Sequence, residues 1–201
     1  MEGTQKANQR AVKIAAVGIM AALGSVMYYF LPEIPLFPGV SFLRFDLSDV
    51  PAVLTGHLLG IGPGVLVAVI KAALHIFNPQ NFTFGIGELI NAIIGGTVVI
   101  CSRGFYLLFK KVIKSGLVAY YNASIITIVI TVLVGIGINL LLMPLYNYIA
   151  GFDQSSFGAL MTLILTAMTP MNAVKAVLLT LPWYPVIKAL RKTLPFVTAE
   201  N

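Results

Sequence analysis

The sequence predicts an all-α integral membrane protein, a compact bundle of six transmembrane helices. Of the 201 residues, 58% are hydrophobic and only 10% are charged, whereas a soluble domain is about half apolar and a quarter charged. The mean hydropathy is +0.93, and several apolar stretches exceed the roughly 20 residues that a helix needs to cross a bilayer. This apolar composition excludes a soluble enzyme and a disordered chain. A disulfide scaffold is excluded as well, because Cys101 is the only cysteine.

Proline and glycine set most of the expected helix ends. Pro32 ends the first helix, because proline disfavours helical structure in the residue before it. Pro51 suits the first turn of the second helix, which the segment Gly60–Gly64 ends. The third helix stops before Pro79. The expected helices cover residues 11–31, 49–60, 64–77, 85–112, 118–148 and 157–192.

These helices differ in length and regularity. The second and third are shorter than a full crossing, which implies tilting or shielding by neighbouring helices. Pro170 and Pro182 should bend the sixth. The segment 32–48, rich in proline and glycine, can enter lipid only if other protein buries it. No polar segment of domain size separates the hydrophobic runs, so residues 1–201 are expected to form a single domain.

Basic residues give the expected orientation. The net charge of +6 is explained by the preference of cytoplasmic loops for lysine and arginine, without a nucleic-acid partner. Six crossings place all three basic clusters on one side, and the polar start of the chain lacks the features of a signal peptide. We therefore expect a multi-pass protein of the cell membrane with both termini in the cytoplasm. The clusters are Lys6, Arg10 and Lys13; Arg103, Lys110, Lys111 and Lys114; and Lys188, Arg191 and Lys192.

Three polar residues inside the hydrophobic runs are the strongest candidates for a functional site. An ionisable group within a membrane helix is costly and is by default a functional candidate. Lys175 lies near the middle of the sixth helix, and Asn172, three residues earlier, points the same way. Asn139 lies in the outer half of the fifth. Their donors and acceptors suit a neutral ligand rich in carbonyls and hydroxyls. The alternative is a structural network between helices, with Lys175 extended toward the interface.

Motifs for catalysis are absent from the sequence. It contains no GxxxxGK[ST], HExxH or GxSxG pattern, so a metal site is not predicted. An enzyme is not predicted either, because no acid is expected beside Lys175. Lys71 and His75 share one face of the third helix, where they could serve in metal binding or a proton relay or form an interfacial pair near the helix end. Glu88 could neutralise either Lys71 or Lys175.

Two further patterns allow two interpretations each. Small residues recur along one face of the first helix, where they could pack within the protein or contact a separate membrane subunit. The aromatic residues of segment 32–48 could clamp a planar ring or form an interfacial belt. The small residues are Ala11, Ala15, Gly18, Ala22 and Ser25, and the aromatic ones are Phe37, Phe42 and Phe45.

Four stretches together resemble the substrate-binding S components of energy-coupling factor (ECF) vitamin transporters, specifically their riboflavin-specific, RibU-type branch. They are residues 42–51, 85–91, 139–146 and 172–175, and the resemblance extends over residues 11–192. It implies a single transmembrane substrate-binding domain of six helices that binds riboflavin at the outer side and has no catalytic residues. Riboflavin is then a transported ligand, and no cofactor is expected.

The resemblance also implies roles for individual residues. Asn139, Asn172 and Lys175 match positions that hydrogen-bond the flavin, and the small residues of the first helix match motifs that meet the coupling transmembrane (T) subunit. Two ATPase subunits would supply the energy for inward release. Further ligand contacts are expected in the loop after the first helix, at Phe42, Arg44, Asp46 and Leu47. The alternatives are the same scaffold specific for FMN or another vitamin, an intramembrane enzyme using Lys175, and a structural adaptor.

Overall fold

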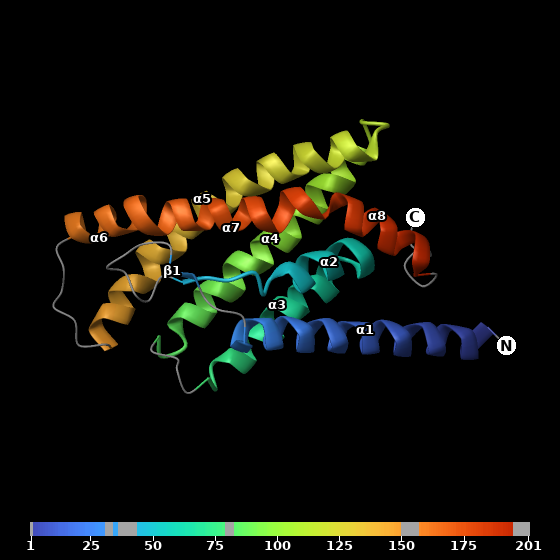
Figure 1. Ribbon diagram of the computed structural model, residues 1–201, viewed down its shortest axis with the longest axis horizontal. Helices are drawn as coiled ribbons and strands as arrows, with labels where there is room; N and C mark the ends of the chain where they lie inside the picture. The colour runs from blue at the N-terminus through green and yellow to red at the C-terminus, as the bar shows by residue number, and fades with distance from the viewer. Residues whose placement is uncertain (1, 31–33, 36–43, 79–82, 150–156, 195–201) are drawn as a thin grey trace.

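The computed structural model describes residues 2–30, 34–35, 44–78, 83–149 and 157–194. Over these residues the regular secondary structure is helical, apart from a two-residue antiparallel pairing of β1 with β2. Figure 1 shows the elements, which in order are α1 (Glu2–Phe30), β1 (Ile34–Pro35), β2 (Arg44–Phe45), α2 (Val50–Leu59), α3 (Ile61–His75), α4 (Ile86–Lys110), α5 (Gly116–Ile149), α6 (Phe157–Leu163), η1 (Ile164–Met168), α7 (Thr169–Thr180), η2 (Leu181–Trp183) and α8 (Tyr184–Thr193).

The predicted helical bundle is confirmed in its main features. The elements α6 to α8 follow one another without a break, so the described residues form six helical segments near the predicted positions. Four segments are long and apolar enough to cross a membrane, whereas α2 and α3 are shorter, as expected. The four are Asn8–Phe30, Ile86–Lys110, Gly116–Ile149 and Phe157–Thr193.

Two predicted boundaries are wrong. Helix α1 begins at Glu2 and not at residue 11, because the residues before Arg10 include good helix formers such as glutamate, lysine, glutamine and alanine. Helix α3 begins at Ile61 and not at residue 64. Pro63 fits within its first turn, where its missing N–H is not needed, so Gly60 alone separates α2 from α3.

Helices α2 and α3 form a tight hairpin. Gly60 connects them with a φ of 116°, a backbone conformation that residues with a side chain rarely adopt. A Cβ added at Gly64 would lie 2.6 Å from Cα of Gly56, so the two helices touch backbone to backbone at this point. The small residues therefore allow two short helices to pack as one unit against the rest of the bundle.

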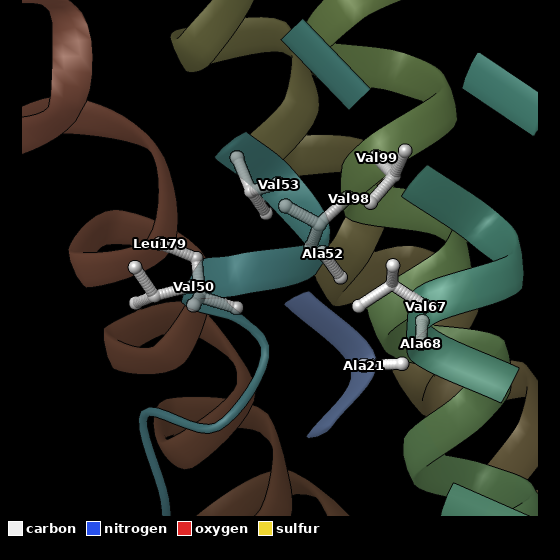
Figure 2. Packing of buried hydrophobic residues seen from close by; sticks show 9 residues of the cluster. All are labelled: Ala21, Val50, Ala52, Val53, Val67, Ala68, Val98, Val99 and Leu179. Atoms are coloured by element: carbon white, nitrogen blue, oxygen red, sulfur yellow. The ribbon is translucent and has the colours of Figure 1, made fainter. Parts of the chain in front are cut away.

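An aliphatic core joins this hairpin to its neighbours. Figure 2 shows small and medium side chains from α1, α2, α3, α4 and α7 pointing toward one another. Large apolar side chains lie on the outside instead, for example Ile14 at 73% exposure, Leu133 at 62% and Leu141 at 70%. An apolar exterior of this kind suits a lipid environment. The core residues are Ala21, Val50, Ala52, Val53, Val67, Ala68, Val98, Val99 and Leu179.

The last helical segment is irregular beside both of its predicted prolines. A π-helical turn, Ile164–Met168, precedes Pro170, and a 3-10 turn, Leu181–Trp183, contains Pro182. Proline cannot donate a backbone hydrogen bond and collides with the carbonyl four residues earlier. Figure 1 shows that α8 runs in a different direction from α7.

Gly64→Ala should destabilise the protein, because its Cβ would collide with the backbone of Gly56, which cannot move aside. We expect a loss of about 1–3 kcal/mol, measured as a lower midpoint of thermal unfolding in detergent. Gly62→Ala is the matched control, because a Cβ at Gly62 meets no atom within 4 Å. Equal midpoints for the two variants would contradict the close approach of α2 and α3.

Candidate ligand-binding site

Lys175 on α7 is buried among polar groups from distant parts of the chain. Its Nζ lies 3.3 Å from Oδ2 of Asp46 and 2.7 Å from Oδ2 of Asp49, and it donates a hydrogen bond to Oδ1 of Asn91 on α4. The expectation that no acid lies beside Lys175 is therefore wrong. The two aspartates precede α2, more than a hundred positions earlier in the sequence, and only the fold brings them to α7.

A second lysine completes the arrangement. Nζ of Lys71, on α3, lies 2.5 Å from Oδ1 of Asp49 and donates to Oγ of Ser48 over 2.9 Å. Oδ2 of Asp49 makes no hydrogen bond of good geometry among the described residues, so its contact with Lys175 is ionic. Asp49 thus lies between two ammonium groups. We call Asp46, Asp49, Lys71 and Lys175 the charge cluster; each is at most 9% exposed, and their formal charges cancel.

Asp46 is held in its ionised form by its surroundings. Burial alone acts to raise the pKa of its carboxyl group, but the ammonium groups of Lys175 and Lys71 act in the opposite direction. Ser48 adds hydrogen bonds to Oδ1, one from its hydroxyl and one of 2.9 Å from its backbone N–H. The pKa of Asp46 is consequently below its ordinary value.

A neighbouring set of aromatic and polar groups ties α1 to this region. The ring of Tyr28 stacks on that of His75 with centroids 3.6 Å apart, and its hydroxyl accepts a 2.7 Å hydrogen bond from Asn91. His75 Nδ1 lies 2.9 Å from Oε1 of Glu88, and Thr83 donates to Oε2 of Glu88 over 2.6 Å. The contacts found for Glu88 among the described residues are therefore with His75 and Thr83, whereas the sequence left Lys71 and Lys175 open as its partners.

Asn139 and Asn172 meet at Gly135 on α5. Nδ2 of Asn139 donates to the carbonyl of Gly135 over 2.7 Å. A Cβ at Gly135 would lie only 3.1 Å from Cγ of Asn172 and closer still to its amide nitrogen. Both asparagines are buried, at 5% and 3% exposure. Because Gly135 has no side chain, the amide of Asn172 on α7 can approach the part of α5 that carries Asn139. Asn172 lies one helical turn from Lys175 along α7.

The loop residues expected to bind ligand have different outcomes. Asp46 belongs to the charge cluster, and Leu47 is half-buried against the aliphatic core. Arg44 lies in β2 with its backbone paired to Pro35, but its side chain is outside the described part of the chain. Phe42 lies wholly outside the described residues, as does Phe37.

The small residues of α1 are mostly at the surface. Ala11, Ala15, Gly18 and Ala22 are exposed, and a Cβ at Gly18 would meet no atom within 4 Å. Ser25 differs, because it is buried and donates to the carbonyl of Ala21 over 2.8 Å. Four of the five positions therefore leave an open, small-residue face on α1.

Sequence reasoning did not assign Asp49, Lys71 or Asn91 to this site. Asp49 is the N-cap residue of α2, but its side chain makes no capping hydrogen bond and contacts the two lysines instead. Charge balance was the available signal. Two lysines deep in apolar helices require buried counter-charges, and the chain has only seven acidic residues from which to draw them.

The arrangement favours binding rather than bond making. Buried amides and one ammonium present hydrogen-bonding groups beside an apolar cluster of α4, α5 and η1 that includes Met143 and Ile164. Among the described residues, no three or more His, Cys, Asp or Glu side chains are grouped so as to hold a metal ion. Two carboxylates around Lys175 stabilise its charged form, whereas a catalytic amine must lose its proton.

Comparison with known proteins gives a consistent family. The family profile described as "ECF transporter, substrate-specific component" matches residues 12–187. The riboflavin transporter RibU of Lactococcus lactis subsp. cremoris is 25% identical over 197 residues, covering 90% of this chain and 93% of the relative. The riboflavin transporter FmnP of Bacillus subtilis is 28% identical over 171 residues, covering 84% and 88%.

The fold is also found in a solved structure. A protein described as the S component of a bacterial ECF transporter superposes with a TM-score of 0.68, covering 92% of this chain and all but 1% of the other. The two sequences are only 19% identical, so this match establishes the shared fold and nothing finer.

Lys71→Met should destabilise the protein by about 3–5 kcal/mol, because it leaves a net buried negative charge. The double variant Lys71→Met/Asp49→Asn restores neutrality, with Lys175 still paired to Asp46, and should recover much of the loss in a thermal unfolding measurement. Lys111→Met, at an exposed position, is the control and should have little effect. A double variant less stable than Lys71→Met would contradict the role of charge balance.

Proposed function

We propose that this chain, which belongs to the family of substrate-specific components of ECF transporters, binds riboflavin at its outer side and delivers it inward with partner subunits. The family consists of transporter components and not of enzymes. In the proposed arrangement the chain is a single transmembrane substrate-binding domain of the cell membrane, with both termini in the cytoplasm.

The observation that carries the proposal is the burial of three polar side chains within apolar helices. Asn139 and Asn172 meet at Gly135, and Lys175 lies one turn further along α7. Riboflavin has a flat ring with apolar faces and a polar edge. The two amides can both donate to and accept from that edge, and the apolar cluster beside them can bury the faces. The names of the relatives from Lactococcus and Bacillus support the same ligand.

The charge cluster has a positioning role in this proposal. Asp46 and Asp49 hold the ammonium of Lys175 in place, so that it can exchange one of its present partners for a carbonyl or hydroxyl of the ligand. A hydrogen bond to a charged donor contributes about 1.5–3 kcal/mol. Arg44, Phe42 and Leu47, from the segment after α1, would add contacts that close the site to water.

The exposed small-residue face of α1 is the proposed contact with the coupling T subunit. Close approach of a second helix requires small side chains, and Ala11, Ala15, Gly18 and Ala22 are exposed. Two ATPase subunits would then drive inward release, since this chain has no phosphate-binding loop of its own.

The fluorescence of riboflavin should be quenched or shifted when it binds to the purified chain. Asn139→Ala and Asn172→Ala should each weaken that binding. We expect a loss of about threefold to tenfold for each, the value of one hydrogen bond. Asn122→Ala is the matched control, because Asn122 lies on α5 but is exposed. Lys175→Met is a less selective test, since it leaves Asp46 and Asp49 with one lysine.

The titration also separates the alternatives. Tight binding of FMN or another vitamin, with no binding of riboflavin, would indicate that the same fold is specific for a different ligand. Unchanged riboflavin affinity in both asparagine variants would remove them from the site.

Ala15→Trp and Ala22→Trp should abolish vitamin uptake by cells while leaving riboflavin binding by the purified chain unchanged, because the added side chains would hold a partner helix away. Leu23→Trp is the control; Leu23 is 48% exposed and projects about 100° away from Ala22 around the helix. Uptake that survives both alanine substitutions would show that this face meets no subunit needed for transport.

A further inference from the structure

A second polar site lies away from the charge cluster, at the end of the bundle where α4 ends, α5 begins and α8 lies (Figure 1). A partly enclosed cavity of about 200 Å³ opens there. Its wall is aromatic and comes from four elements: His57 of α2, Tyr106 of α4, Tyr120 of α5 and Tyr184 of α8. The rings are in mutual contact, with the centroid of His57 5.8 Å from Tyr106 and 5.3 Å from Tyr120.

His57 is the unusual member of this wall. The side chain is buried, at 1% exposure, yet neither ring nitrogen has a hydrogen-bond partner among the described residues. A buried polar group without a partner is costly, so such groups call for an explanation. An imidazole lining a cavity can donate one hydrogen bond and accept another, and a bound ligand would satisfy it.

The rim of the cavity is basic. Lys188, Arg191 and Lys192 line it, and none of the described residues that line it is acidic. Arg191 is fixed in place, because Nη2 donates to the backbone carbonyl of His57 over 2.8 Å and Nη1 to the hydroxyl of Tyr106 over 3.4 Å. The guanidinium has five N–H donors, so donors remain for a ligand. The two lysines are exposed and can move toward an anion.

We propose that this cavity binds a phosphate group, carried either by the headgroup of an anionic phospholipid or by a soluble phosphate. Arginine and lysine together match the charge and the several acceptor oxygens of phosphate. The hydroxyls of Tyr106 and Tyr184 and the imidazole of His57 supply neutral hydrogen bonds deeper in the cavity. A cation is excluded by the basic rim. The site is separate from the proposed riboflavin site and does not depend on it.

The test measures phosphate binding by the purified full chain. Inorganic phosphate is titrated against chloride at equal ionic strength, with the midpoint of thermal unfolding as the readout. In parallel, native mass spectrometry counts phosphatidylglycerol molecules retained from nanodiscs that also contain phosphatidylcholine. We expect one saturable phosphate or one retained phosphatidylglycerol per chain; the first identifies a soluble source and the second a lipid.

Two matched double variants distinguish the cavity from general attraction to a basic surface. Lys188→Gln/Lys192→Gln should weaken binding about tenfold or more, because it removes charge-assisted hydrogen bonds. Lys111→Gln/Lys114→Gln removes two exposed lysines that do not line the cavity, and it should change affinity little. His57→Phe keeps an aromatic ring at this position but lacks ring nitrogens, and it should weaken binding about threefold to tenfold.

Three results would overturn the proposal. One is the absence of saturable binding of either probe. Another is an equal loss in the two double variants, which would indicate diffuse electrostatic attraction. The last is unchanged affinity in both His57→Phe and Lys188→Gln/Lys192→Gln, provided that circular dichroism shows both variants folded.

Discussion

The pairing of two lysines with two aspartates in the interior constrains the rest of this bundle. Ionised groups in a low-dielectric interior must be paired, since the desolvation of a single one costs several kcal/mol. Lys175 comes from α7, Lys71 from α3, and the aspartates from the segment before α2. These three parts of the chain must therefore meet at one point. Asn172 and the asparagine-bearing part of α5 are positioned as a consequence.

Neutral side chains extend the charge cluster to two further helices, α1 and α4. Asn91 of α4 accepts from Lys175 and donates to the hydroxyl of Tyr28 on α1. The Tyr28 ring lies 4.7 Å below the ammonium of Lys71 and stacks on His75. Asn91 of α4 thus contacts both α7 and α1, and Tyr28 of α1 contacts α3. Specific polar pairs in the interior, surrounded by aliphatic side chains, thus hold the bundle together. Such pairs matter because lipid provides no hydrophobic force between helices.

The helices were largely predictable from the sequence, but the contacts within the site were not. Apolar length and proline positions located the six segments, because those signals are local. The placing of Asn172 and Lys175 on one face of a helix also followed from local geometry. The pairing of Lys175 with Asp46 is different, since 129 positions separate the two residues. Nothing local specifies that pairing, and Asp49 occupies the N-cap position of α2, where an acidic residue is common without any buried partner. Likewise, His57 lacks a hydrogen-bond partner among the described residues because of how α4, α5 and α8 meet around it.

The balance of charges within the cluster has a consequence for movement in an electric field. An isolated elementary charge carried across a membrane exchanges about 2.3 kcal/mol with a potential of 100 mV. Two positive and two negative groups that travel together exchange none. The charge cluster could thus be displaced through the thickness of the bilayer without drawing on, or being opposed by, the voltage across it.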